Sequence, residues 1–395
     1  MKVAQINSTC HAGSTGKICM EISTLLSEKG IDNLIFHGQV GCDFPKAECY
    51  SGKYYAMFQA FKAHILGNYG FNSSCATKKL ISHLEKFDPD IVHLHNIHSH
   101  ECNVGMLLDY LKNKNVKVVW TFHDCWAFTA YCTHFDYINC SKWKSGCCSC
   151  PQYKSKSFFF DRSKALFERK KEMQYGMDLT VITPSRWLSD LVGKSFFREY
   201  PRYVIHNGID LNVFRPWDDN FRKKLGVKGK MILGVAYDWG KRKGLDVFIE
   251  LRKRLEDDYT IVLVGADESL KKTLPDGIIP IRKTQNREEL AGIYSAADVF
   301  FNPTREDTYP TVNMEAIACG TPVVTFRTGG SIEIIDDTCG IAVERDDIDA
   351  AEHAIRKVCE NQLFKRDDLI KKAGEFDKNK CFLEYLALYN RLLPE

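Results

Sequence analysis

Short apolar runs alternate with helix-forming segments along the whole chain. Runs of this length are typical of parallel strands buried on both faces, and their alternation with helices is typical of βαβ units. They fall into two sets of about six, which predicts two Rossmann-like α/β domains rather than one oversized sheet. The first set covers 3–6, 34–36, 91–95, 116–122, 179–182 and 203–205, and the second covers 231–235, 260–264, 278–281, 299–301, 323–326 and 341–343.

The boundary between the two sets is a turn-rich stretch, His-Asn-Gly-Ile-Asp, at 206–210. Residues of this kind favour a loop over a helix or a strand. We therefore predict one domain over residues 1–206, a second over 207–378, and a final apolar-periodic helix over 379–395.

Composition narrows the class of protein. The chain has 395 residues, of which 44% are hydrophobic and 12% aromatic, as in an ordered globular protein. A net charge of +3 is too small to favour a nucleic-acid partner. Residues 1–7 lead straight into a predicted strand without a signal-like apolar region, and no run is as long as a membrane span. We expect a cytoplasmic protein whose sixteen cysteines are mostly reduced.

The stretch from 299 to 324 organises the second half of the chain. It predicts a buried strand, a polar loop that contains Pro303 and Pro310, a short helix, and a second buried strand after Gly320. The helix therefore begins just outside the carboxyl end of a parallel strand. An open α/β sheet binds phosphorylated ligands at such a place.

Two acids flank the start of that helix, Asp307 in the loop and Glu315 eight residues later. A helix N-terminus attracts anions, so Glu315 is a candidate acceptor for sugar hydroxyls and Asp307 for those of a second ring. The alternative is that both are ordinary surface acids that compensate the helix dipole.

The segment after the first strand carries Gly13 and Gly16, which would let backbone amides approach a phosphate at the next helix N-terminus. It matches neither a Walker A loop nor the dinucleotide fingerprint, and a plain tight turn is the alternative. After the first strand of the second half, Lys241, Arg242 and Lys243 suit a diphosphate, with a solvated basic turn as the alternative.

His123 and Asp124 end another predicted strand of the first half. An imidazole beside a carboxylate at the carboxyl end of a strand is well placed to contact a substrate, although a hydrogen-bonded structural histidine is the alternative. His93 and His95 alternate onto one sheet face, and no acid lies at a spacing that would complete a zinc site with them.

The loop over 125–151 is rich in cysteine. Four thiolates there would complete a tetrahedral structural zinc site, which would stabilise a loop that has few aliphatic residues. Reduced thiols and disulfides are the alternatives, and a catalytic zinc is not expected because four sulfur ligands leave no open position. The four candidate ligands are Cys132, Cys140, Cys147 and Cys150.

Two stretches mix aromatic and basic residues, 54–71 and 154–171. Basic amphipathic segments of this kind lie on anionic lipid in some proteins. Peripheral membrane contact is therefore one hypothesis, and a solvated protein face is the other.

The spacing Asp307-x7-Glu315, with Ala-x-Ala-Cys-Gly-Thr-Pro-Val-Val after the second acid, resembles the E-x7-E signature of retaining glycosyltransferase family 4. Asp307 stands where the family has its first glutamate, and Thr308-Tyr309-Pro310 replaces the usual G-F-G. The Cys-rich loop with the preceding His-Asp-x-Trp-x-Phe-Thr resembles the capsule and exopolysaccharide (colanic-acid-type) sub-branch of the family.

The resemblance implies a GT-B fold, in which two facing Rossmann-like domains enclose an interdomain cleft. It makes 1–206 the acceptor-side domain and 207–378 the nucleotide-sugar-binding domain. It also implies that the helix over 379–395 packs back on the first domain.

Site roles follow from the same resemblance. The catalytic set is His123, Asp307, Arg242 and Lys243, with Lys243-Gly244 matching the family's K-G. Arg242 is less well matched, because the family's arginine stands elsewhere. The donor-binding set is Gly13, Gly16, Arg242, Lys243, Lys283, Thr311, Val312 and Glu315.

The implied reaction is hexosyl transfer from a UDP- or GDP-sugar to a saccharide or lipid-linked acceptor, with retained anomeric configuration and without a catalytic cofactor. Surface-polysaccharide synthesis on the inner side of the cell membrane is the expected setting. The alternatives are a sugar-nucleotide epimerase of the same fold and a zinc-containing binding or assembly protein with a degenerate transferase site.

Overall fold

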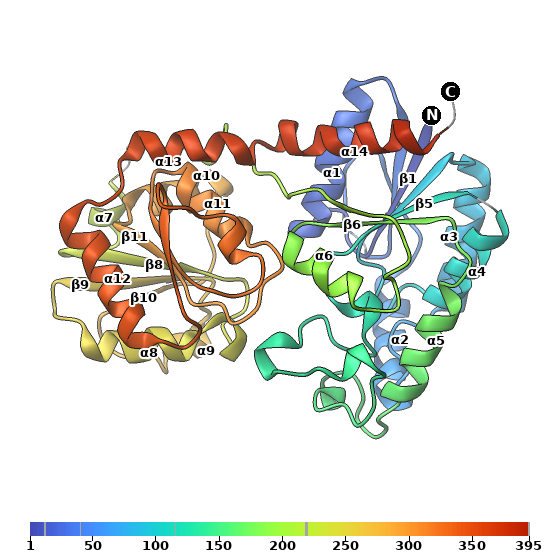
Figure 1. The fold of residues 1–395 in the computed structure, drawn as a ribbon, viewed down its shortest axis with the longest axis horizontal. Helices are drawn as coiled ribbons and strands as arrows, with labels where there is room; N and C mark the ends of the chain where they lie inside the picture. Colours follow the sequence, from blue (N-terminus) through green and yellow to red (C-terminus); the bar gives the residue numbers. More distant parts are fainter. Residues whose placement is uncertain (12, 40, 115, 218–219, 394–395) are drawn as a thin grey trace. The chain divides into compact units, whose positions relative to one another are not determined.

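The computed structural model describes residues 1–11, 13–39, 41–114, 116–217 and 220–393. The chain forms two compact units; in Figure 1 the first is blue to green together with the red end of the chain, and the second is yellow to orange-red. The first unit comprises Met1–His206 together with Phe382–Glu395, and the second comprises Asn207–Cys381. Each is built on a parallel sheet with helices, so the predicted fold class of two Rossmann-like domains is confirmed.

The first unit has, within the described residues, a seven-stranded sheet in the order β3-β2-β1-β4-β5-β6-β7, with parallel neighbours. The predicted runs lie in six of these strands. Sequence analysis missed β3, a short strand at the sheet edge whose residues are not buried. The strands are β1 (Lys2–Asn7), β2 (Asp32–His37), β3 (Ala47–Cys49), β4 (Ile91–Leu94), β5 (Lys117–Thr121), β6 (Leu179–Thr183) and β7 (Arg202–Val204).

The helices of the first unit turn apolar residues towards this sheet, as Leu107, Leu108 and Leu111 of α4 do. A long connection with short 3₁₀ helices joins β5 to α5 and contains the Cys-rich loop. The helices are α1 (Gly13–Glu28), α2 (Lys53–Leu66), α3 (Ser74–Phe87), α4 (Val104–Lys114), α5 (Ser163–Met173) and α6 (Arg186–Gly193).

The second unit has, over the residues that the structure describes, a six-stranded parallel sheet in the order β10-β9-β8-β11-β12-β13. Its strands are β8 (Lys230–Val235), β9 (Tyr259–Val264), β10 (Ile278–Ile281), β11 (Val299–Asn302), β12 (Val323–Phe326) and β13 (Gly340–Val343). Its helices are α7 (Phe221–Lys224), α8 (Leu245–Arg254), α9 (Glu268–Lys271), α10 (Arg287–Ala296), α11 (Thr311–Ala318), α12 (Ile348–Asn361) and α13 (Arg366–Ala373).

Both sheets reverse their strand order at the first strand of the unit. β1 lies between β2 and β4, and β8 lies between β9 and β11. Ligands of open α/β sheets bind outside the carboxyl ends of the strands at such a switch point. The loops after β1 and β4, and after β8 and β11, are therefore where each unit is expected to bind its ligand.

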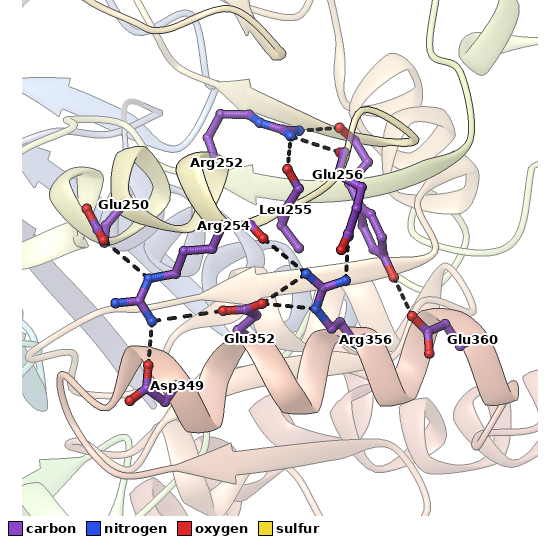
Figure 2. A network of polar contacts seen from close by, with 10 residues as sticks. Glu250, Arg252, Arg254, Leu255, Glu256, Asp349, Glu352, Arg356 and Glu360 are labelled. Carbon is purple, nitrogen blue, oxygen red and sulfur yellow. Dashed lines mark hydrogen bonds and ion pairs between the residues drawn. The ribbon is translucent and has the colours of Figure 1, made fainter.

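Charged side chains join α8 to α12 in the second unit (Figure 2). Arg254 of α8 pairs with Asp349 and Glu352 of α12, and Arg356 of α12 pairs with Glu352 and with Glu256. Such partly exposed pairs each contribute little free energy, so we regard this network mainly as an alignment of the two helices.

The last helix, α14 (Lys378–Leu392), starts in the second unit and continues into the first. Its later turns pack on the first sheet, where the Tyr389 hydroxyl lies 2.6 Å from Nδ1 of His93 in β4. The Tyr385 ring lies 5.4 Å from the same imidazole. Among the described residues, no helix combines the length and the apolar composition needed to cross a bilayer.

Candidate active site

Two predicted diphosphate ligands and a predicted catalytic acid lie together in the second unit. Lys243 ends a short 3₁₀ helix after β8, and Asp307 lies in the loop after β11. Lys243 Nζ is 2.6 Å from Asp307 Oδ2, and the two side chains are 17% and 19% exposed. Arg242 donates from Nη1 to the carbonyl oxygen of Glu306 at 3.0 Å. The fold therefore brings Arg242, Lys243 and Asp307 to one switch point.

Arg305 fixes the loop that carries Asp307. Its Nη1 and Nη2 donate to the two carboxylate oxygens of Asp246 in α8 at 2.8 and 2.9 Å, and its Nε donates to Asp346 at 2.6 Å. The Arg305 amide also donates to the carbonyl oxygen of Arg242 at 2.8 Å. The hydrogen bonds to Asp246 raise the pKa of Arg305. Partial burial alone would raise the pKa of Asp246, but the interactions of Asp246 with Arg305 outweigh burial and lower it. Sequence analysis missed Arg305, whose only signal was a cation directly before two acids.

A glycine turn fixes the backbone of Asp307 from the other side. The Gly330 amide donates to the Asp307 carbonyl oxygen at 3.0 Å. Gly329 has φ of 53°, and a Cβ there would lie 1.9 Å from that same oxygen, so no larger residue fits. The position of Asp307 is therefore set before any ligand binds.

The start of α11 presents backbone amides without a side-chain cap beside this loop. Pro310 precedes the helix and offers no side-chain cap, so the amides of Thr311 and Val312 carry the positive end of the helix dipole. One turn on, Glu315 Oε2 accepts a hydrogen bond from the hydroxyl of buried Tyr294 at 3.1 Å. Burial and the nearby Glu315 carboxylate raise the pKa of Tyr294, so this phenol remains a donor that orients Glu315.

Lys283 lines a pocket at the carboxyl ends of β8, β9 and β10. Trp239, Gly265 and Arg282 are among the other lining residues, and Trp239 Nε1 donates to the Val264 carbonyl oxygen at 3.1 Å. A planar ring system could contact backbone atoms, the Trp239 indole and the two cations in this pocket. The structure groups Lys283 with this pocket rather than with the Lys243–Asp307 pair.

The two predicted glycines of the first unit have different roles. Gly13 begins α1 with φ of 71°, and a Cβ there would meet nothing within 4 Å. Gly16 is buried, and a Cβ there would lie 2.6 Å from the Cys10 carbonyl oxygen and 2.9 Å from Thr9 Oγ1. Gly16 therefore serves the close packing of α1 on the preceding loop, whereas Gly13 stays open to solvent.

His123 follows β5 and joins a chain of buried side chains. Its Nε2 lies 3.0 Å from Nδ1 of His95, and the two rings stack with 5.3 Å between their centroids. Nε2 of His95 lies 3.2 Å from Gln5 Oε1, and Gln5 Nε2 donates to the Cys19 carbonyl oxygen at 3.1 Å. His123 is therefore oriented from β1 and β4, the strands of the switch point.

This order of partners defines the histidine tautomers. The amide oxygen of Gln5 only accepts, so His95 carries its proton on Nε2 and accepts at Nδ1 from the Nε2–H of His123. Burial lowers the pKa of His123 to about 4 and that of His95 well below its ordinary value, so both rings are neutral near pH 7. The acceptor nitrogen of His123 is then Nδ1, which suits a hydroxyl group of a substrate.

Asp124, the acid next to His123, bonds to a histidine that sequence analysis did not single out. Its Oδ2 lies 2.8 Å from Nε2 of His98, and its Oδ1 accepts from the Trp126 amide at 2.8 Å. Burial opposes ionisation, yet His98 and the amide lower the pKa of Asp124 to about 2. Asp124 is therefore a buried carboxylate with fixed partners at the start of the Cys-rich loop.

The four predicted zinc ligands line one small cavity together with Phe135 and Trp143. Cys132 donates a hydrogen bond to Cys150, which raises the pKa of Cys132 and lowers that of Cys150 to about 7. Within the described ranges, no group of three or more His, Cys, Asp or Glu side chains has the arrangement of a metal site. Structural zinc at Cys132, Cys140, Cys147 and Cys150 therefore stays a prediction.

Lys170 stabilises the Cys-rich loop in a way that the sequence did not reveal. Its buried Nζ donates to the carbonyl oxygens of Trp126, Thr129 and Ala130 at 2.8, 2.9 and 3.2 Å, and lies 3.2 Å from the centre of the Trp126 ring. Burial lowers its pKa well below the ordinary value. Lys170 belongs to the stretch 154–171, which sequence analysis expected to face either a membrane or solvent, and that expectation is wrong for this residue.

Family models identify the class of protein. The model described as Glycosyltransferase Family 4 matches residues 16–213, and the model described as Glycosyl transferases group 1 matches residues 218–376. The first match alone covers half of the chain. The chain belongs to glycosyltransferase family 4 and is a glycosyltransferase, which confirms the resemblance and the predicted enzyme class.

Individual relatives agree with this assignment. An Escherichia coli K12 protein described as a colanic acid biosynthesis glycosyl transferase, WcaC, is 23% identical over 74% of this chain and 72% of its own length. The D-inositol 3-phosphate glycosyltransferase of an Arthrobacter species is 36% identical, but over only 35% of this chain and 37% of that relative.

Solved structures share the two-unit fold. Sucrose-phosphate synthase from Thermosynechococcus elongatus superposes with a TM-score of 0.74 at 18% identity, covering 99% of this chain and 98% of that one. Anabaena HepE, solved with UDP and glucose, superposes with a TM-score of 0.70 at 14% identity over the whole of both chains. These likenesses establish the GT-B fold.

Proposed function

We propose that this glycosyltransferase moves a hexose from a nucleoside diphosphate sugar to a hydroxyl of a saccharide or lipid-linked saccharide and retains the anomeric configuration. The observation that carries the proposal is the Lys243–Asp307 pair beside Arg242, directly before the uncapped start of α11. Cations and backbone amides that are fixed in advance suit a leaving diphosphate, because they need little reorganisation when its charge develops.

The proposed reaction breaks the bond between the sugar C1 and the β-phosphate oxygen. Arg242, Lys243 and the amides of Thr311 and Val312 stabilise the charge that develops on the departing diphosphate. The acceptor oxygen forms its bond to C1 on the face that the diphosphate leaves, and the acceptor proton passes to a diphosphate oxygen. No step of this scheme requires a cofactor.

The remaining roles follow the chemistry of each side chain. Asp307 orients the donor sugar, Glu315 accepts the ribose hydroxyls, and the pocket lined by Lys283 receives the base. Neutral His123 accepts a sugar hydroxyl at Nδ1. UDP is the favoured nucleotide because HepE, which shares the fold, was solved with UDP.

The proposed setting is the synthesis of a capsular polysaccharide, an exopolysaccharide or another surface glycan, with the enzyme working in the cytoplasm. The likeness to the E. coli protein of colanic acid biosynthesis supports the product class. The compartment is proposed from the sequence alone; in the structure Cys10 and Cys42 form a disulfide, and the other described cysteines are thiols.

A thermal-shift screen against UDP, GDP, ADP and their sugars, without added metal, tests the donor site. A nucleotide at a hundred times its Kd stabilises the protein by about 2.7 kcal/mol. Arg242→Ala and Glu315→Ala should each lose this shift, whereas Arg254→Ala in the α8–α12 network should keep it. A flat response to every nucleotide contradicts the proposal and favours a binding protein with a degenerate site.

Product analysis then separates transfer from epimerisation. The enzyme should release nucleoside diphosphate only when a saccharide acceptor is present. Conversion of the sugar nucleotide to an isomer without any acceptor would instead identify an epimerase.

A further inference from the structure

The first unit exposes an aromatic surface that the active site does not use. Four of its residues lie on α2 and three on the segment before α5, and each is between 53% and 85% exposed. We call this surface the aromatic patch. It consists of Tyr54, Met57, Phe58, Phe61, Phe158, Phe159 and Phe160.

The α2 helix has the reverse of the usual polarity. Tyr54, Phe58 and Phe61 recur at the spacing of one helix face and point to solvent, whereas the buried residues are Gln59 and Ala63. A helix on the surface of a soluble protein normally turns its large apolar side chains inward. Contiguous exposed apolar surface of this kind marks a site of protein or membrane interaction.

The two parts of the patch are joined in space although they are about a hundred residues apart in the sequence. The Phe158 amide donates to the carbonyl oxygen of His64 in the last turn of α2 at 2.7 Å, and the two rings lie 5.1 Å apart. The rings of Phe159 and Phe160 follow at 6.3 and 6.2 Å spacing. Figure 1 shows α2 beside the start of α5 at one end of the first unit. The aromatic side chains thus form one surface.

The segments around the aromatic patch contain few acidic residues. The sequence has no Asp or Glu between Glu48 and Glu85, and none between Asp136 and Asp161. The carboxylate of Asp161 accepts bonds from the amides of Cys150 and Ser163 within its own loop. The segments that carry the patch are therefore mainly basic, and the acid next to it in sequence, Asp161, is bound to two backbone amides. The exposed cations nearest in sequence are Lys53, Lys62, Lys154, Arg162 and Lys164.

We propose that the aromatic patch docks on the surface of an anionic lipid bilayer. The aromatic rings would enter the boundary between headgroups and acyl chains, and the lysines would contact anionic headgroups. A second copy of the chain is a poorer partner, because two surfaces with an excess of basic residues repel each other. This inference does not depend on the nucleotide-sugar chemistry, and its test is independent of catalysis.

Flotation of the full-length protein with vesicles tests the proposal. We expect binding at low salt to vesicles of equal parts phosphatidylglycerol and phosphatidylcholine, and little binding to phosphatidylcholine alone. High salt should release most of the protein, because salt screens charges at the headgroup surface.

Two variants separate the aromatic and the charge contributions. Phe58→Ser with Phe61→Ser and Phe159→Ser should lower the bound fraction at least about tenfold. Lys53→Gln with Lys62→Gln and Lys154→Gln should lower the partition coefficient on the order of a hundredfold, since each such cation contributes roughly a factor of five.

Matched control variants remove an aromatic ring or three lysine charges at exposed positions outside the patch. Tyr175→Ser deletes an exposed aromatic ring outside the patch, and a combination of Lys357→Gln, Lys371→Gln and Lys380→Gln deletes three exposed charges of the second unit. Both should bind vesicles like the unchanged protein.

Three outcomes would overturn the proposal. They are the absence of wild-type binding to anionic vesicles at low salt, equal binding by the patch variants and the controls, and a self-associated protein that the aromatic variant converts to a monomer. Circular dichroism and nucleotide binding show whether each variant is folded.

Discussion

The two switch points of this glycosyltransferase use the same sheet architecture with opposite electrostatics. In the second unit the side chains are charged and paired, as in Lys243 with Asp307 and Arg305 with Asp246. In the first unit they are neutral imidazoles in a buried chain, centred on His95. The comparison indicates that the switch point of the second unit suits an anionic ligand, and that of the first unit suits hydroxyl groups.

Burial explains the difference. The loops after β8 and β11 keep some contact with solvent, so paired charges persist there at moderate cost. In the first unit, the residues that follow β5 include buried Phe122, Trp126 and Phe128, and an unpaired charge in such apolar surroundings would be expensive. Asp124 is ionised there because His98 and a backbone amide compensate it.

Removing a charge from the second unit should have the largest effect. Lys243→Ala should lower kcat/KM by about a hundredfold to a thousandfold, because a preorganised group that stabilises the leaving diphosphate is lost. Lys241→Ala is the matched control, since the Lys241 side chain is more exposed than that of Lys243, and the substitution keeps the Lys241 carbonyl oxygen that accepts from Arg305. Steady-state assays of nucleoside diphosphate release measure both. Equal activity of the two variants would contradict the assigned role of Lys243.

Much of this charged site could be predicted from the sequence, because its residues are adjacent to recognisable strands, prolines and a helix start. Asp307, Glu315 and Lys243 stood out by their local spacing, and the family resemblance implied their roles. Arg305 could not be assigned, because its partners Asp246 and Asp346 lie about sixty residues before it and forty after it. Only the folded sheet brings these carboxylates to one guanidinium.

The neutral site of the first unit was harder to predict. His123 stood out at a strand end, but the order Gln5–His95–His123 requires the register of β1 beside β4. Lys170 was misplaced because a lysine between exposed basic residues normally faces solvent. Its burial follows from backbone carbonyls of a loop that is about forty residues away in the sequence.

The Cys-rich loop offers a second test of the comparison, because it follows β5 directly after His123 and Asp124 of the first unit. We propose that Cys132, Cys140, Cys147 and Cys150 hold one structural zinc. Cys147→Ser should lose the metal and lower the unfolding temperature by roughly 5–10 °C, since loss of a structural metal removes several kcal/mol. Elemental analysis and thermal scans measure these effects.

Cys75→Ser is the matched control for the zinc prediction, since Cys75 is an exposed thiol in α3. It should keep both the metal and the unfolding temperature. A purified protein that contains no zinc, or a disulfide found within the loop, would contradict the prediction.

Acid should weaken the first unit through its neutral histidines. Burial lowers the pKa of His93 and His95 well below about 6.5, the value expected in the unfolded chain. Below pH 6.5 the unfolded state therefore binds more protons than the folded state, and stability falls by up to about 1.4 kcal/mol per pH unit for each such histidine. Urea unfolding at a series of pH values measures the slope.

A variant assigns this acid sensitivity to the buried chain. His95→Gln removes one buried imidazole and should reduce the slope below pH 6.5, although it costs stability at pH 7. His353→Gln, at an exposed position of α12, should leave the slope unchanged. An unchanged slope in His95→Gln would show that acid acts elsewhere in the molecule.

We expect the smallest effect from changes in the charged network between α8 and α12. Such a change tests whether a charge of the second unit matters for activity only where it lies in position to contact a ligand. Arg254 has several carboxylate neighbours in Figure 2, but its side chain and most of theirs are partly exposed. Arg254→Ala should leave the free energy of unfolding nearly unchanged, because solvent screens such pairs, and should leave kcat/KM unchanged. Chemical denaturation and the same release assay measure both quantities. A large loss of activity would mean that the α8–α12 alignment controls the loop held by Arg305, since Asp246 in α8 anchors that loop.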